Sequence, residues 1–187
     1  RDELTSFLAR HAWEAQLAPT WDAARWDALA CHGIDMNDFV VVRERDNIVG
    51  AAALWDQRAV RQTVIMGYRG VLRLARPLVN VFASVGLAPS LPAPGHVLPL
   101  AAVLGATVSE DRQWAPLWRA LRDSARARDL GWLSIARGAD DPQLAVLRDV
   151  AGGREYRTRL YDVRWPGTPT WSDAWHALPF RPEVALL

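Results

Sequence analysis

The segment from residue 97 to residue 136 places the strongest constraint on how this chain can fold. Residues 97–108 are almost all apolar, and a continuous apolar run is typical of a strand covered on both faces. A helix is expected over about residues 114–130, and a second buried strand over residues 132–136. Strand, helix and strand in this order predict a parallel βαβ unit, whose sheet must carry helices on its faces.

The loop at residues 109–113 joins the first of these strands to the helix. Unpaired N–H groups and the positive end of the helix dipole favour an anion where such a loop meets a helix. An enzyme would hold a cofactor phosphate at this point. The loop nevertheless contains no glycine, and Pro116 removes one N–H donor from the first turn of the helix.

The first half of the chain reads as helices followed by a hairpin. Residues 4–30 have helical apolar spacing that Pro19 interrupts, and Thr20 is expected to cap a second short helix. Apolar runs at residues 38–43 and 48–55 flank a polar turn and predict a β-hairpin. In the long connection at residues 69–96, Pro77 is expected in the first turn of a helix that stops at Gly86.

The last part of the chain predicts a helix over residues 142–150 and a long strand over residues 156–165. Thr170 is expected to cap one helical turn with Trp171 and Trp175, and residues 183–187 to form a last short strand. The order of elements predicts an α/β fold: a mixed, largely antiparallel central sheet with one parallel βαβ crossover and flanking helices. We expect a single domain over residues 1–187, with a helical part (1–38), a hairpin (39–68), a long connection (69–96) and a strand–helix core (97–187).

Composition narrows the classes of partner and cofactor. The formal net charge of +1 gives no reason to expect nucleic acid or a membrane as a partner. A single cysteine rules out an internal disulfide, and none of the four histidines forms an i, i+4 pair, so no metal site is predicted. These features favour a cytoplasmic protein. The chain does not begin with Met, and we expect it to be a piece of a longer chain.

Several segments carry a resemblance to a known superfamily. They are the residues Ile48-Val49-Gly50 and Gln62-Thr63-Val64, and residues 53–57, 160–165 and 182–187. Together with the order of elements, they make the chain resemble the acyl-CoA N-acyltransferases of the GNAT superfamily. Together, these segments are similar to the C-terminal domain of bacterial proteins that carry two GNAT-like domains in tandem. The resemblance implies a neighbouring N-terminal GNAT-like domain as a partner.

The resemblance also implies a cofactor and a set of site residues. Acetyl-CoA or another acyl-CoA would lie where two parallel strands separate, and its pyrophosphate would meet backbone N–H groups of an Arg/Gln-x-x-Gly-x-Gly/Ala loop. Ala115 and Leu117 replace the two glycines of that loop, and the Tyr that protonates the departing thiolate would fall near Arg148 or Asp149. The residues implied in cofactor binding are Val108, Arg112, Gln113, Trp114 and Ala115.

Glu110 and Tyr161 are the candidate catalytic residues, as a base facing an incoming amine and as a proton donor. Each has a structural alternative: a carboxylate before a helix often serves the helix dipole, and a tyrosine in a strand often packs. Two functions therefore stay open. The chain is an acyl-CoA-binding N-acyltransferase acting on an unknown amine, or a non-catalytic GNAT-like domain that serves as a structural or partner-binding module.

Overall fold

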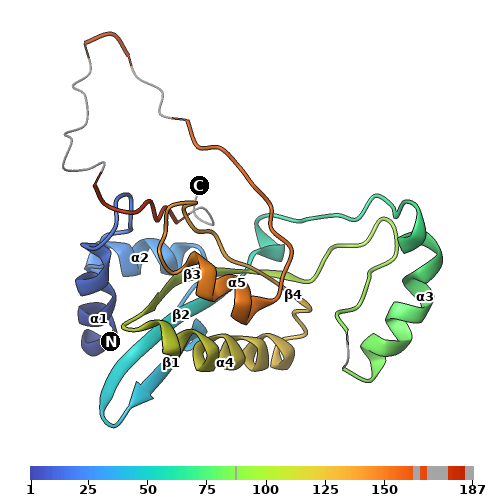
Figure 1. The fold of residues 1–187 in the computed structure, drawn as a ribbon, viewed down its shortest axis with the longest axis horizontal. Helices are drawn as coiled ribbons and strands as arrows, with labels where there is room; N and C mark the ends of the chain where they lie inside the picture. The colour runs from blue at the N-terminus through green and yellow to red at the C-terminus, as the bar shows by residue number, and fades with distance from the viewer. Residues whose placement is uncertain (87, 162–164, 168–176, 184–187) are drawn as a thin grey trace.

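The computed structural model describes residues 1–86, 88–161, 165–167 and 177–183. Its centre is a four-stranded sheet in the order β1-β2-β3-β4 (Figure 1), formed by Phe39–Glu44, Asn47–Asp56, Leu100–Val108 and Trp132–Ser134. The first two pairs of strands are antiparallel, and β3 and β4 are parallel. The predicted mixed sheet with one parallel crossover is therefore confirmed, and it is the arrangement that the GNAT resemblance implies.

Helices cover both faces of this sheet. On one face lie α1 (Asp2–Ala12) and α2 (Ala23–Cys31), and on the other lie α4 (Trp114–Ala127) and α5 (Leu144–Ala151). The side chains of β2 alternate between the two layers: Ala52 and Leu54 pack in the α4 layer, and Ala51 and Ala53 in the α1/α2 layer. The remaining α-helix, α3 (Val71–Ser84), lies away from the sheet at one end of the molecule (Figure 1), and short 3-10 turns occupy Met36–Asp38, Gln57–Ala59 and Asp111–Gln113.

A one-residue bulge in β3 changes which face its side chains meet. Ala101 and Val103 pack in the α4 layer before the bulge, and Ala106 and Val108 pack there after it. The register against β2 shifts by one residue at the same place. Gly105 lies in the bulge with φ +57°, a left-handed conformation that favours glycine.

The strand and helix boundaries differ from the predictions in ways that prolines and local bonds explain. The strand predicted from residue 97 is β3, and it begins at Leu100, because Pro99 has no N–H to donate to a neighbouring strand. The helix that contains Pro77 begins at Val71, so Pro77 lies inside α3 and not in its first turn. The cap of α2 is Asp22, whose carboxylate accepts from the Arg25 N–H, and not Thr20.

The predicted strand at residues 156–165 is wrong where the structure describes it. Residues 156–161 have no regular structure, and Tyr156 is 92% exposed, so this segment has neither the pairing nor the burial that its apolar alternation suggested. Residues 162–164, the predicted turn with Thr170, Trp171 and Trp175, and residues 184–187 lie outside the described residues. The fifth helix begins at Leu144, after a turn in which the Asp141 carboxylate accepts from the Gln143 N–H.

Candidate functional site

The two parallel strands separate after a short pairing. β3 and β4 are paired only over Leu100–Ala102 and Trp132–Ser134, and the chain then diverges from the remaining half of β3. The predicted β-strand over residues 132–136 accordingly ends two residues early. The divergence leaves a slot between the second half of β3 and residues 135–137, at the place where the resemblance locates an acyl-CoA.

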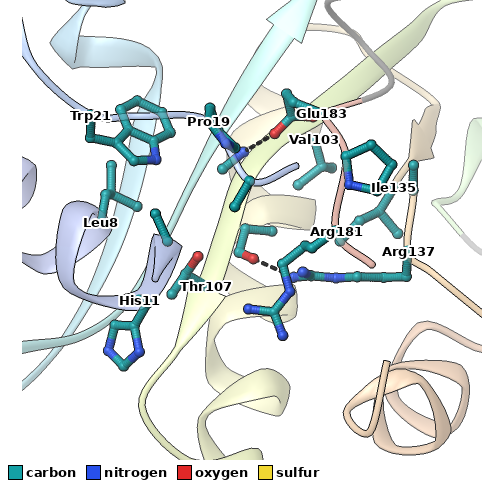
Figure 2. A pocket seen from close by; sticks show the side chains of 16 residues that line it. Leu8, His11, Pro19, Trp21, Val103, Thr107, Ile135, Arg137, Arg181 and Glu183 are labelled. Atoms are coloured by element: carbon teal, nitrogen blue, oxygen red, sulfur yellow. Dashed lines mark hydrogen bonds between the residues drawn. The ribbon is translucent and has the colours of Figure 1, made fainter. Parts of the chain in front are cut away.

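The chain itself fills this slot (Figure 2). The Glu183 Oε2 atom accepts a hydrogen bond of 2.7 Å from the Gly105 N–H, which the bulge has released from the ladder. From the other side, the Arg137 guanidinium donates to the carbonyl of Ala106. The remaining cavity has a volume of about 30 Å³. That is room for one or two waters, compared with roughly 300–1,000 Å³ for typical ligand pockets.

Residues 178–183, called here the C-terminal strap, are held by several further bonds. Gln16, in the connection between α1 and α2, pairs with Phe180 in a parallel bridge, and the Gln16 N–H donates to the Pro179 carbonyl at 3.0 Å. The Arg181 N–H donates back to the Gln16 carbonyl at 3.1 Å. The strap also passes close to Gly138, where a Cβ would lie 2.1 Å from the Phe180 carbonyl oxygen. Gly138 is therefore required for the strap to lie where it does.

The buried charges in the slot are arranged in opposite pairs. Arg181 Nε lies 3.0 Å from Asp141 Oδ2, and Arg137 Nη1 lies 3.6 Å from the same oxygen. Burial, and then repulsion from Arg181, lower the pKa of Arg137 to about 10, against the attraction of Asp141 and Glu183. Arg137 therefore stays charged at neutral pH. Burial raises the pKa of Glu183, opposed by the Gly105 N–H and the nearby Arg137.

The predicted pyrophosphate loop uses its own donors internally. The Gln113 N–H donates to the Glu110 carbonyl at 3.0 Å, and the Trp114 N–H donates to the Asp111 carbonyl. The side chain of Gln113 is buried, where its Oε1 accepts from the Glu110 N–H at 2.6 Å. These amides are two of those that the resemblance assigns to the cofactor, and in this structure they close a 3-10 turn.

The charge in front of α4 is mainly negative. Arg112, with its side chain 63% exposed, lies 3.0 Å from Glu110 and 3.2 Å from Glu44. The Gln113 side chain, followed by the charge of Arg112, lowers the pKa of Glu44. Asp111, next to Arg112 in the sequence, adds a third carboxylate, so this helix N-terminus is already supplied with anions.

The other predicted site residues do not gather around the slot. Val108 and Trp114 are buried in the α4 layer, and the Trp114 ring lies under the Arg137 guanidinium at 5.1 Å. Ala115 is exposed in the first turn of α4. Tyr161 is 76% exposed on an irregular segment, so it does not have the strand position from which proton donation was predicted.

Sequence reasoning missed the residues that occupy the slot: Arg137, Asp141, Arg181 and Glu183. Their only sequence signal is the glycine at Gly105 inside an apolar run, which is typical of a bulge or a close backbone approach. No group of three His, Cys, Asp or Glu side chains suited to a metal ion occurs in the part of the chain that the structure describes. None of the described helices is long and apolar enough to cross a membrane.

No protein-family model matches this sequence, and no curated protein matches it. Among solved structures, the chain is similar to one described as "Putative acetyltransferase from Agrobacterium tumefaciens str. C58". The two share 13% sequence identity with a TM-score of 0.46, over 88% of this chain and 94% of the other. Function resides in sites and not in a backbone shape, so the residues of this chain decide what it does.

Proposed function

We propose that this chain is a GNAT-like domain that does not transfer acyl groups and serves as a structural or partner-binding module. The observation that carries the proposal is the occupied slot: the Glu183 carboxylate sits on the Gly105 N–H, and the Arg137 guanidinium sits on the Ala106 carbonyl. A thioester arm entering between the strands would need the same space and the same backbone groups.

Emptying the slot would disrupt a connected set of buried interactions. Withdrawal of the strap would break the pairing of Gln16 with residues 179–181 and leave Asp141 without Arg181. Arg137 would then retain Asp141 at 3.6 Å as its neighbouring carboxylate. Breaking a buried ion pair by removing one partner costs about 3–5 kcal/mol when the remaining charge is left uncompensated. Because Arg137 stays beside Asp141, this range is the upper value of the cost that a ligand would have to offset.

The charges at the start of α4 also oppose a pyrophosphate. A diphosphate would approach Glu44, Glu110 and Asp111, with Arg112 as the neighbouring cation. The two ion pairs of Arg112 are exposed and individually weak, so exchanging their carboxylates for a phosphate costs little free energy. The surplus of negative charge around the phosphate would nevertheless remain. The internal bonds of Gln113 and Trp114 remove two further donors.

One observation favours the alternative function, an acyl-CoA-dependent N-acyltransferase acting on an amine. The strands separate where the resemblance requires it, and the bulge directs the Gly105 N–H into the gap. If the strap left, this amide and Arg137 would face an open slot. Acetyl-CoA binding would then depend on the strap, with Arg112 to Ala115 at the pyrophosphate and Glu110 as base.

Titration of acetyl-CoA by calorimetry separates the two functions. The wild-type chain is compared with the double variant Arg181→Ala/Glu183→Ala, which loosens the strap, and with Arg112→Glu. We expect no heat of binding at millimolar acetyl-CoA for any of them, with circular dichroism checking that each is folded. Saturable binding that increases in the double variant and decreases on adding Arg112→Glu would establish the acyltransferase function instead.

As a module, the domain is expected to work beside a neighbouring GNAT-like domain in the cytoplasm. The GNAT resemblance of residues 48–57 and 160–165 to tandem proteins supports this partner. Co-expression of this chain with the adjoining domain of its natural protein tests it. Co-purification of the two as a stable complex is expected, and their elution as separate monomers would count against it.

A further inference from the structure

The helix α3 presents an apolar seam to solvent. Val71, Leu74, Leu78, Val81 and Val85 are 81%, 83%, 60%, 62% and 66% exposed. Their spacing alternates between three and four residues, which is the a/d spacing of a coiled-coil seam. These five residues therefore form one straight stripe along the helix, called here the α3 seam.

On its other side, α3 binds the segment that connects it to β3. The Arg76 Nε and Asn80 Nδ2 atoms both donate to the Leu91 carbonyl at 3.1 Å, and the Asn80 Oδ1 atom accepts from the Leu91 N–H at 2.8 Å. The half-buried side of α3 consists of Arg76 and Asn80 with the smaller Ala75, Val79 and Ala83, whereas its large apolar residues face outward, and none of its residues is fully buried. An amphipathic helix with an exposed apolar face requires a cover.

The charges around the seam restrict what can cover it. Residues 57–109 include five arginines and no acidic residue. Within the described part of the chain, Arg61, Arg69 and Arg73 make no ion pair, and Arg69 and Arg73 lie at the start of α3. The positions that flank the seam are uncharged, so nothing along it opposes pairing with an identical seam.

We propose that a second copy of this chain covers the α3 seam by antiparallel pairing of α3 with α3, with Leu78 of each copy at the twofold axis. Leu78 is the middle residue of the seam, so a twofold axis there places Val71 of one copy opposite Val85 of the other, and Leu74 within one residue of Val81. Antiparallel pairing places Arg69 and Arg73 of one copy beside the carboxyl end of the other helix, where the dipole favours cations. Parallel pairing would instead place arginine against arginine.

The exposed apolar area fits a dimer of modest stability. Six large hydrophobic residues on or beside the seam are at least two-fifths exposed: Val71, Leu74, Leu78, Val81, Phe82 and Val85. At about 60–120 Å² of apolar area each, they offer on the order of 500 Å² per copy and 1,000 Å² per pair. This comes close to the lower end of specific interfaces, about 1,200–2,000 Å².

A lipid surface fits the helix less well than a second copy does. Helices that lie in a membrane interface keep their basic residues free on the polar face, toward the headgroups. In α3, Arg76 and Asn80 bind Leu91, and the nearby arginines without an ion pair in the described part of the chain, Arg69 and Arg73, lie at one end of the helix and not along its length. The inference uses no residue of the slot, so it stands or falls independently of the acetyl-CoA titration.

Sedimentation equilibrium of the full 187-residue chain at micromolar concentrations tests the proposal. We expect a dimer for the wild-type chain and a monomer for Leu78→Arg, with little change in circular dichroism and thermal midpoint because Leu78 is 60% exposed. Tyr156→Arg is the matched control, since Tyr156 is also exposed but lies far from α3 in sequence. This variant should remain a dimer.

Disulfide trapping tests the orientation in a Cys31→Ser background, since Cys31 is exposed. Leu78→Cys alone should form a covalent dimer on mild oxidation, and Val71→Cys should couple to Val85→Cys but not to itself. A wild-type monomer overturns the proposal, and so does a dimer that survives Leu78→Arg. Capture of monomers by phosphatidylglycerol vesicles, lost in Leu78→Arg, would overturn it in favour of a lipid surface.

Discussion

Replacement of Gly105 by alanine tests whether the bulge in β3 requires glycine. Two separate costs are expected. A residue with a side chain pays about 1–2 kcal/mol to adopt the left-handed conformation that Gly105 has at φ +57°. The added Cβ would also lie 2.7 Å from Cζ2 and 3.1 Å from Cη2 of Trp21, which is buried. Overpacking of this kind costs typically about 1–3 kcal/mol.

The expected loss in the free energy of unfolding for Gly105→Ala is therefore about 2–5 kcal/mol. Gly33→Ala is the matched control, because Gly33 has φ +73° and a Cβ there meets no atom within 4 Å. That variant should lose only the backbone part, about 1–2 kcal/mol. The difference between the two variants measures the contact with Trp21.

Urea denaturation followed by circular dichroism gives both free energies on the same scale. A third comparison uses the Trp21→Leu background. There, Gly105→Ala should cost less free energy of unfolding than it does in the wild-type chain, because the smaller leucine leaves room for the added Cβ. Equal losses in Gly105→Ala and Gly33→Ala would refute the packing argument. No loss of stability in Gly105→Ala would refute the assignment of the bulge itself.

Three further variants probe other parts of the molecule by the same denaturation assay. Asp22→Ala should lose about 1 kcal/mol, because it removes the cap bond of 2.8 Å to the Arg25 N–H, and an unchanged midpoint would contradict this. Leu121→Ala should lose about 2–5 kcal/mol, since Leu121 is fully buried; a loss below this range would mean that the α4 layer collapses around the site. Burial raises the pKa of Glu183 in the folded state above its ordinary value of 4.5. The contribution of Glu183 to stability therefore falls as the pH rises from 4.5 through the pKa of the folded state. Glu183→Gln should accordingly stabilise the chain more at mildly alkaline than at mildly acidic pH. The opposite pH trend would mean that Arg137, and not burial, controls Glu183.

The central part of the fold follows from local sequence patterns. Buried strands and an amphipathic helix each leave a periodic signal, so the order β3-α4-β4 and the parallel pairing could be predicted from residues 97–136. The hairpin turn between β1 and β2 was likewise visible as four polar residues between apolar runs, and Arg45 there has φ +54°. The boundaries of the elements were predicted less well. They depend on the missing N–H of Pro99 and on the capping hydrogen bond of Asp22, and a periodic pattern contains neither.

The candidate site could not be predicted in the same way, because it is made of contacts between distant segments. Glu183 and Gly105 are 78 residues apart, and Arg181 and Asp141 are 40 apart. Neither pair leaves a local pattern. The prediction for residues 156–165 shows the opposite error: alternating apolar residues predict a strand, but a strand also needs a neighbouring edge, and residues 156–161 lie beside none.

In the proposed function, the slot and the α3 seam have related roles. An acyltransferase needs the space between the separated strands for its cofactor, but in this chain Arg137 and Glu183 occupy that space through hydrogen bonds to the backbone of β3. The long connection before β3 meanwhile projects α3 away from the slot (Figure 1), with its apolar side outward. In the proposed dimer, a second chain would cover the apolar area of the α3 seam, just as the strap covers the buried charges of the slot, and both arrangements meet the requirement that apolar area and charge be covered.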